Sequence, residues 1–166
     1  MIKRLLKLLQ IMFFGIKERN KLFNHKNMKK VPTFESLKLG DEIPSLKIQS
    51  VSRHTLALYC GASGDHNPIH VDLDYAISVG LDDVIAHGML SAGYLARMLT
   101  DWIPQSAIKS INNRFTAMTH IGDSVTCTAK VVEKFVKENE KLVRLEMHAQ
   151  TPQAQTIIAE AVIALL

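Results

Sequence analysis

The stretch HGMLSAGYLARMLTDW, residues 87–102, is apolar or small at almost every position from Gly88 to Ala96. A helix that is apolar nearly all round is buried rather than lying on the surface. Its small residues would let other backbone approach closely: Gly88, Ser91, Ala92, Gly93 and Ala96. It reaches water only near Arg97 and Asp101, which are spaced for an i,i+4 ion pair. We therefore expect a central helix that the other elements surround.

Strands are predicted on the C-terminal side of this helix. In SVTCTAKVV (124–132) and LVRLEMHA (142–149), apolar and polar residues alternate, which indicates antiparallel strands with one covered face. The turns ENEK (138–141) and TPQA (151–154) separate the strands by distances typical of hairpins. The segment TIIAEAVIALL (156–166) is apolar on both faces except for one glutamate, which predicts a central strand. These patterns predict an α+β domain in which one antiparallel sheet surrounds one buried helix.

Two short helices and one strand are predicted on the N-terminal side. Ser52 is a suitable N-cap, and the run GDHNP breaks the helix that Ser52 begins. The expected boundaries are a strand over Leu46–Val51, a helix over about 53–62, and a second helix that starts at Asp72 or Asp74 and ends at Gly80. On the first helix, one face is expected to carry Leu56, Ala57 and Cys60.

The formal charge of +4 is distributed unevenly along the 166 residues. Residues 1–30 hold nine Lys/Arg and one acid, whereas the other 136 residues hold 11 basic and 15 acidic groups. The body has no excess of positive charge with which to bind a phosphate backbone, which argues against a nucleic-acid-binding protein. Cys60 and Cys127 form no C-x-x-C pair, and we expect two buried thiols in a reducing, cytosol-like compartment.

Residues 1–30 form a basic N-terminal extension, and residues 31–166 form the predicted domain. The extension has an apolar helical stripe, but its apolar run from Leu8 to Ile16 is too short to span a bilayer, and no small-residue cleavage site follows it. It could be an organellar transit peptide, an amphipathic surface anchor, or an over-extended start before a true first residue at Met28. We favour the third alternative, which predicts a cytoplasmic protein. A transit peptide would place the protein in the mitochondrial matrix.

The run GASGDHNPIH, residues 61–70, is the candidate for chemistry. Asn-Pro after Asp is common in turns, so a structural role is one alternative. A serine nucleophile is another, but GASGD departs from G-x-S-x-G and follows a helix, so Ser63 is expected at a helix terminus. A metal site is a third, although Pro68 prevents one helix from aligning the two histidines. Its possible ligands are Asp65, His66 and His70, with Asp72 or Asp74 nearby.

The fourth alternative is an acid–base pair formed by Asp65 and His70 on one loop. A carboxylate and an imidazole differ enough in intrinsic proton affinity that one can give a proton while the other takes one near neutral pH. Asn67 could orient the carboxylate by a hydrogen bond, and Pro68 would stiffen the loop. The first N–H groups of the helix that begins at Gly88 have no intrahelical partner and could hold an oxyanion. This combination suits proton chemistry beside a carbonyl.

Three segments of the chain resemble the MaoC-like, or hydratase-2-like, family of (R)-specific enoyl-thioester hydratases and dehydratases. YCGASGDHNPIH (59–70) resembles the G-D-x-N-P-[aliphatic]-H core of that family, DVIAHGMLSAGYL (83–95) its second segment, and RFTAMTHIGDSV (114–125) its third. The segments occur in the family's order over most of residues 40–165, and they closely resemble those of the catalytic subunits of bacterial (3R)-hydroxyacyl dehydratases. The usual proline of the third segment is replaced around Met118–Thr119, so the acyl chain length need not follow the family.

The resemblance implies a hot-dog fold, in which a curved antiparallel sheet wraps one long helix. It implies that Asp65 and His70 are catalytic, that the N–H of Gly88 holds the oxyanion, and that Asn67 supports the carboxylate. From its place directly before Gly88, His87 is expected to orient the loop by hydrogen bonding, in preference to direct proton transfer. The implied reaction is reversible hydration of a trans-2-enoyl thioester to the (3R)-hydroxyacyl thioester in fatty-acid metabolism. The acyl group would be carried by CoA or acyl carrier protein, and no metal or redox cofactor is expected. The implied assembly is a homodimer, or a heterodimer with another hot-dog subunit.

Two other functions stay open within this fold. The chain could be a non-catalytic partner subunit that shapes an acyl pocket, although the presence of both Asp65 and His70 argues against this. It could also be an acyl thioesterase, which product analysis separates because free thiol appears only in hydrolysis. Lys109 and Arg114 are candidates for contacts with carrier phosphates, although a solvated face explains them equally well. Ser91 and Tyr94 are candidates for the acyl tunnel, although we favour core packing for both.

Overall fold

The computed structural model describes residues 31–166, so the expectations for the basic extension lie outside the described residues. Among residues 31–166, no helix is long and apolar enough to cross a membrane. The elements are β1 (Leu46–Ile48), α2 (Arg53–Ser63), the 3-10 helix η2 (Pro68–His70), α3 (Leu73–Ser78), α4 (Gly88–Thr100), the 3-10 helix η3 (Gln105–Ala107), β2 (Ile108–Phe115), β3 (Val125–Lys137), β4 (Glu140–Gln150) and β5 (Gln155–Ala164).

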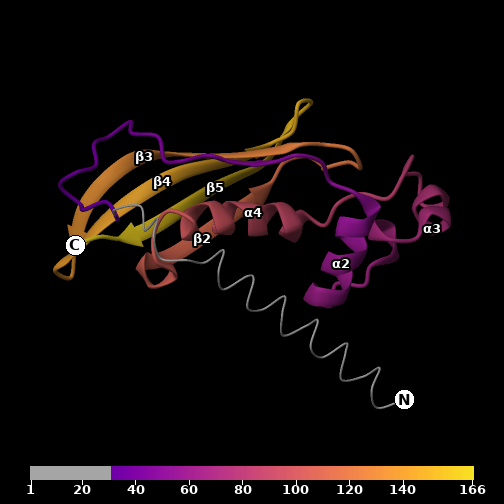
Figure 1. Ribbon diagram of the computed structural model, residues 1–166, viewed down its shortest axis with the longest axis horizontal. Coiled ribbons are helices and arrows are strands. Elements are labelled where there is room, and N and C mark those ends of the chain that lie inside the picture. Colours follow the sequence, from indigo (N-terminus) through magenta and orange to yellow (C-terminus); the bar gives the residue numbers. More distant parts are fainter. Residues whose placement is uncertain (1–30) are drawn as a thin grey trace, which may run out of the picture. The chain divides into compact units, whose positions relative to one another are not determined.

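The five strands form one antiparallel sheet in the order β1-β3-β4-β5-β2. Successive hairpins place β3, β4 and β5 side by side, and β1 and β2 occupy the two edges. The sheet curves over α4, which contacts all five strands (Figure 1). This is a hot-dog fold, and the predicted α+β class is confirmed.

The face of the sheet that covers α4 is built by the alternation seen in the sequence. Every apolar residue predicted to face inward on β3 and β4 is buried: Val125, Cys127, Ala129 and Val131, then Val143, Leu145, Met147 and Ala149. β5 lies between β4 and β2, as expected for a central strand, and its Glu160 pairs with Arg144 on the outer face. Burial raises the pKa of Cys127 to about 12, so its thiol stays protonated and unreactive.

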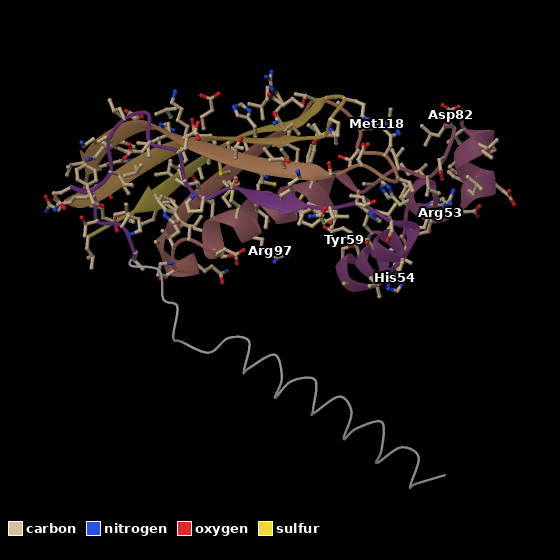
Figure 2. The ribbon with its side chains drawn as sticks, turned by 45° about the horizontal axis from the view of Figure 1, so that its top comes forward. Arg53, His54, Tyr59, Asp82, Arg97 and Met118 are labelled. Atoms are coloured by element: carbon tan, nitrogen blue, oxygen red, sulfur yellow. The ribbon has the colours of Figure 1, made fainter. Side chains whose placement is uncertain are left out.

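Helix α4 is less enclosed than its composition predicts. Its sheet-facing side is buried at Leu90, Leu95 and Leu99, but Met89 is 57% exposed, and Gly93 is exposed as well. Arg97, labelled in Figure 2, lies on this open stripe and pairs with Asp101 at 3.5 Å, as predicted. The expectation of burial all round was wrong for this stripe, because one curved sheet covers only one side of a helix in the single chain.

Both short helices begin at their predicted caps and α2 stops where predicted, whereas α3 ends at Ser78, two residues before the predicted Gly80. The Oγ of Ser52 accepts a hydrogen bond from the N–H of Thr55 at 3.1 Å. Helix α2 is C-capped by Gly64, whose φ of 76° lies in the left-handed region that favours glycine. The carboxylate of Asp72 accepts from the N–H of Tyr75 at 3.0 Å and caps α3. These caps fix both ends of the loop that carries the GASGDHNPIH motif.

Helix α2 is anchored to the rest of the domain at two points. Leu56 is its one buried residue, whereas Ala57, which was expected on the same face as Leu56, is exposed. Arg53, labelled in Figure 2, forms an ion pair with Asp83, in which its Nη2 donates to Oδ1 at 2.8 Å and to Oδ2 at 2.7 Å. Because Asp83 lies shortly before α4, this pair holds α2 close to the segment that leads into the central helix.

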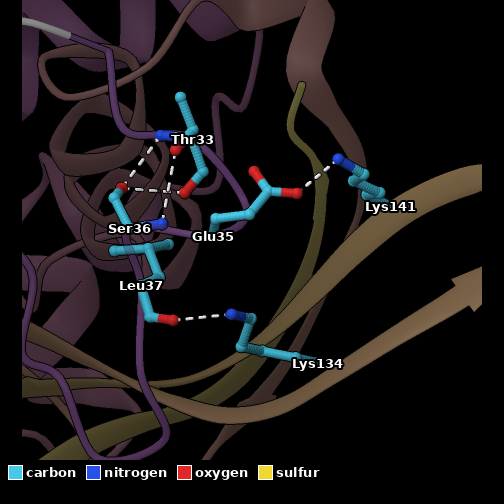
Figure 3. Close-up of polar contacts among 6 residues, drawn as sticks. All are labelled: Thr33, Glu35, Ser36, Leu37, Lys134 and Lys141. Carbon is cyan, nitrogen blue, oxygen red and sulfur yellow. Dashed lines mark hydrogen bonds and ion pairs between the residues drawn. The ribbon is translucent and has the colours of Figure 1, made fainter.

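The segment from residue 31 to residue 44, here called the strap, runs along the β3–β4 hairpin and the last residues of the chain (Figure 3). Three contacts hold it there: the N–H of Phe34 donates to the carbonyl of Leu166 (2.9 Å), Lys134 Nζ donates to the carbonyl of Leu37 (2.6 Å), and Glu35 pairs with Lys141. Further along, Gly40 N–H donates to the carbonyl of Val131 at 2.8 Å, and the N–H of Val131 donates to Asp41 at 2.9 Å. The strap therefore belongs to the folded domain.

Candidate active site

The loop after α2 directs the carboxylate of Asp65. The N–H of Asp65 donates to Ser63 Oγ at 3.2 Å, and the N–H of Asn67 donates to Asp65 Oδ1 at 3.3 Å. Ser63 is the last residue of α2, as predicted, and its hydroxyl serves the turn. Main-chain groups thus set the direction of the acid.

The side chain of Asn67 has a different contact from the expected one. Its Oδ1 accepts a hydrogen bond from the N–H of Ile69 at 3.2 Å and so caps η2, which begins at Pro68. The support for Asp65 that was expected from the Asn67 side chain comes instead from the Asn67 main chain. The Asn-Pro pair starts a single 3-10 turn, and this turn carries His70 to the interior.

His70 is held in one orientation and is 7% exposed. Its Nδ1 lies 2.7 Å from the carbonyl oxygen of Ile85, which can only accept, so Nδ1 carries the proton. Nε2 of the neutral ring therefore has a free lone pair and is the atom that can take a proton from a substrate. Ile85 is itself positioned by a hydrogen bond from its N–H to the carbonyl of Ile69 at 3.2 Å.

His87 lies against both members of the pair. It is 1% exposed, and its Nε2–H donates to the main-chain carbonyl of Asp65 at 3.2 Å. Its ring stacks on that of His70, with centroids 3.8 Å apart and planes 26° apart. The ring of Tyr59 meets it edge-on at 4.9 Å. Burial lowers the pKa of His87, and the bond to Asp65 opposes this only in part, so the ring is neutral near pH 7.

The side chains of Asp65, His70 and His87 converge. Each offers a nitrogen or carboxylate oxygen, and these atoms lie within 4.8 Å of one another. Lone pairs of imidazole lie in the ring plane, so two stacked, nearly parallel rings do not point at one common ion. The His66 and Asp74 of the metal alternative are exposed and do not join the group, and Asp72 caps α3. The arrangement suits proton transfer better than metal ligation.

Helix α4 begins directly beside this group. His87 is its N-cap and makes no side-chain hydrogen bond to the helix, so the first N–H groups of α4 are left for another acceptor. At Gly88 a β-carbon would lie 2.9 Å from Cε1 of Phe115, too close for ordinary contact. The missing side chain at Gly88 therefore leaves room for the Phe115 ring at the helix start.

A cavity of about 190 Å³ opens beside Gly88 and extends into the space between α4 and the sheet. Its wall includes His70, Gly88, Phe115, Met118 and Thr119. Ser91, a tunnel candidate, also lines it and lies 3.4 Å from the hydroxyl of Thr119. Tyr94, Lys109 and Arg114 do not line this cavity, and Lys109 pairs with Glu140 at 2.6 Å.

Phe115 was not singled out in the sequence, although it stands inside the third resembling segment. Its contact with Gly88 joins strand β2 to helix α4, and the spacing of residues within either element does not predict a contact between the two elements. Thr119 lies where the family proline is replaced, and the sequence did not indicate that its side chain lines the cavity.

Residues 36–152 match the family model of the MaoC like domain. The match covers well over half of the chain, and the chain therefore belongs to the MaoC-like domain family. The fold described above is in keeping with this membership.

Individual relatives carry more specific names. The (R)-specific enoyl-CoA hydratase of Rhodospirillum rubrum is 38% identical over 100 residues, covering 59% of this chain and 68% of that protein. The mitochondrial 3-hydroxyacyl-[acyl-carrier-protein] dehydratase of Arabidopsis thaliana is 25% identical over 108 residues, covering 65% of this chain and 64% of that protein. The unliganded R-hydratase PhaJ1 of Pseudomonas aeruginosa gives a TM-score of 0.70 at 27% identity, covering 80% of this chain and 84% of that one. The matched segment spans about two thirds of the two curated relatives.

Proposed function

We propose that this protein is a hydro-lyase that reversibly hydrates trans-2-enoyl thioesters to (3R)-3-hydroxyacyl thioesters. The observation that carries the proposal is the convergence of Asp65 and His70 within 4.8 Å, next to the uncapped start of α4. Membership of the MaoC-like family and the names of the relatives support the same reaction class.

In the dehydration direction, Nε2 of His70 accepts the α-proton from C2. The electrons of that C–H bond pass toward the thioester carbonyl, and the N–H at Gly88 holds the oxygen where negative charge develops. The double bond then forms between C2 and C3 as the C3 hydroxyl leaves. Protonated Asp65 gives its proton to that hydroxyl, which departs as water.

The proton on His70 must return to Asp65 before the next turnover. The two groups are close enough for this to occur directly or through the released water. In the hydration direction the flow reverses, so the Asp65 carboxylate accepts a proton from water and the His70 imidazolium gives one to C2. The two residues exchange roles with direction and are best treated as one coupled pair.

The proposed substrate carrier is CoA or acyl carrier protein, in fatty-acid metabolism. We also propose a dimer, either of two copies or with another hot-dog subunit. In the part of the chain that the structure describes, β2 pairs with β5 along one edge and with no strand along the other. An open strand edge of this kind is a site where a second chain can add a strand.

A direct assay with purified full-length protein tests the reaction. But-2-enoyl-CoA is the first substrate, and three products are followed: loss of the conjugated double bond, the configuration of the 3-hydroxyacyl product, and free thiol. Hydration to the (3R) product without thiol release is expected. Thiol release would instead indicate a thioesterase, and inactivity on every enoyl thioester tried would indicate a partner subunit.

Two extensions of the assay address the carrier and the metal. Enoyl groups of rising length, each supplied on CoA and on acyl carrier protein, give the preferred length and carrier. The activity is expected to survive dialysis against a chelator, because neither proposed proton transfer uses a metal ion. Loss of activity that added Zn²⁺ or Fe²⁺ restores would favour the metal alternative.

A further inference from the structure

His87 connects the three parts of the proposed site. As N-cap residue it directly precedes Gly88, where the central helix begins. Its ring stacks on the base, His70, at 3.8 Å, and its Nε2–H holds the main chain of the acid, Asp65, at 3.2 Å. One side chain therefore touches both members of the acid–base pair, although neither proton transfer passes through it.

The environment of His87 keeps the ring uncharged. The side chain is 1% exposed, and burial lowers its pKa. The hydrogen bond to a carbonyl oxygen assigns the remaining proton to Nε2, so Nδ1 carries only a lone pair. That Nδ1 is buried, and no group among the described residues bonds to it.

A neutral ring in this position favours a charged His70. The face of an aromatic ring attracts a cation placed over it, whereas two imidazolium rings at stacking distance would repel each other. The other titratable groups that the structure places against the stack are Asp65, from the loop, and Tyr59, from α2. Ionised Asp65 also favours a charged His70, and Tyr59 contacts His87 rather than His70.

We propose that His87 is a positioning residue with two separable actions: its neutral ring stabilises the imidazolium that His70 becomes during turnover, and its N–H fixes the main chain of Asp65. The proposal rests on the proposed function, since it assigns His70 the role of base. A merely structural histidine would affect folding stability but would leave the pH profile of the reaction unchanged.

Two substitutions separate the two actions. His87→Phe keeps a ring to stack on His70 but removes the N–H that Asp65 accepts. His87→Gln keeps an N–H donor but removes the ring. A control is His148→Gln, because His148 also has a buried Nδ1 that is unbonded among residues 31–166, and it pairs only with Glu146 on the outer face of the sheet.

The test measures kcat, KM and melting temperature from about pH 5.5 to pH 9 for the full-length protein with but-2-enoyl-CoA. Both His87 variants are expected to lose about 10- to 100-fold in kcat with little change in KM. His87→Gln is expected to move the acid-side fall in dehydration rate to lower pH, because His70 then accepts a proton less readily. His87→Phe should keep the acid-side fall in dehydration rate near the wild-type pH. His148→Gln should match the wild type over the whole pH range.

A second readout does not depend on activity. Nitrogen-15 NMR of the histidine rings is expected to show His87 as the neutral Nε2–H tautomer between about pH 7 and pH 8. A His87 that becomes charged in that range would overturn the proposal, as would wild-type pH profiles in both variants. If the wild type itself has no activity on any enoyl thioester, the proposed function fails instead, and the two failures are distinguishable.

Discussion

The ring of Phe115 approaches Gly88 closely: a β-carbon at residue 88 would lie only 2.9 Å from Cε1 of Phe115. Strand β2 and helix α4 thus meet at a glycine that is also the proposed oxyanion donor. A substitution at Gly88 therefore has two separable effects, a steric contact with the ring and a change at the thioester oxygen.

Gly88→Ala is expected to cost about 2.7–4 kcal/mol in transition-state stabilisation, mostly in kcat, if its methyl group keeps the thioester from the N–H. Phe115→Ala separates this effect from the clash with the ring. If the clash is the cause, Gly88→Ala/Phe115→Ala will be as active as Phe115→Ala alone. If the methyl blocks the thioester, the double variant stays slow. Melting temperatures show whether the helix start is intact.

Removal of the N–H itself is the sharper test of the oxyanion site. In the Phe115→Ala background, Gly88→Pro removes that N–H, whereas Gly88→Ala keeps it. Proline is tolerated at the first position of a helix, and His87, with φ −57° and ψ 129°, already has the extended backbone that precedes proline. The Pro variant should be at least about tenfold slower than the Ala variant. Equal rates in two well-folded variants would place the oxyanion elsewhere.

Asp65→Asn and His70→Gln are each expected to lower the hydration rate by about two to four orders of magnitude while the protein stays folded. Asp65 is exposed in the single chain, so Asn fits there without repacking. His66→Gln, at an exposed position within the same loop, is the matched control and should retain its rate. Near-full activity of either Asp65→Asn or His70→Gln over a range of enoyl thioesters would contradict the mechanism.

Stability should fall as the pH is lowered through the ordinary range of histidine, near 6.5. The folded protein disfavours protonation of His87, whose pKa is lowered by burial, so the unfolded chain binds more protons there. The melting temperature of the wild type should therefore drop between about pH 7 and pH 5 more steeply than that of His87→Phe. Parallel curves for the two proteins would show that His87 does not contribute to the pH dependence.

A chain that starts at Met28 is expected to keep its fold, its assembly and its turnover, because the strap remains whole. A chain that starts at Gly40 loses the contacts of Phe34 and Glu35 with the hairpin and the last residues. It should melt at a lower temperature, with its activity at low temperature largely kept. Aggregation of the chain that starts at Met28 would show that the first 27 residues contribute to the core.

The sequence predicted the parts of the structure that depend on local periodicity and caps. The alternation through Val125 and Cys127 needed only a period of two, and the caps Ser52 and Asp72 needed only a side-chain acceptor near a helix start. The closeness of the Asp65 and His70 side chains was predicted because the two residues are only five positions apart in the chain. These features are set by residues close in the chain.

Features that depend on which elements cover one another were not predictable in this way. The exposure of Met89 and Gly93 follows from how far the sheet curves around α4. The role of Asn67 depended on the exact turn that Pro68 begins. The stacking of His70 on His87 joins a 3-10 turn to a helix N-cap, and the hydrophobic pattern of neither segment indicates it.

The proposed acid–base residues Asp65 and His70 stand on an excursion of the chain between β1 and α4, outside the strands that hold the sheet together. From Ser52 to Asp82 its hydrogen bonds run within the excursion or to residues 83–87, and its wholly buried apolar side chains are those of Leu56 and Ala76. A region with so little buried apolar surface can open by itself while the sheet persists. The fraction of active protein then depends on the equilibrium between the closed and the open excursion. Activity would therefore disappear at a lower denaturant concentration than the one that unfolds the sheet. An acyl thioester seated against His70 and Gly88 would close the excursion and raise its resistance to proteolysis.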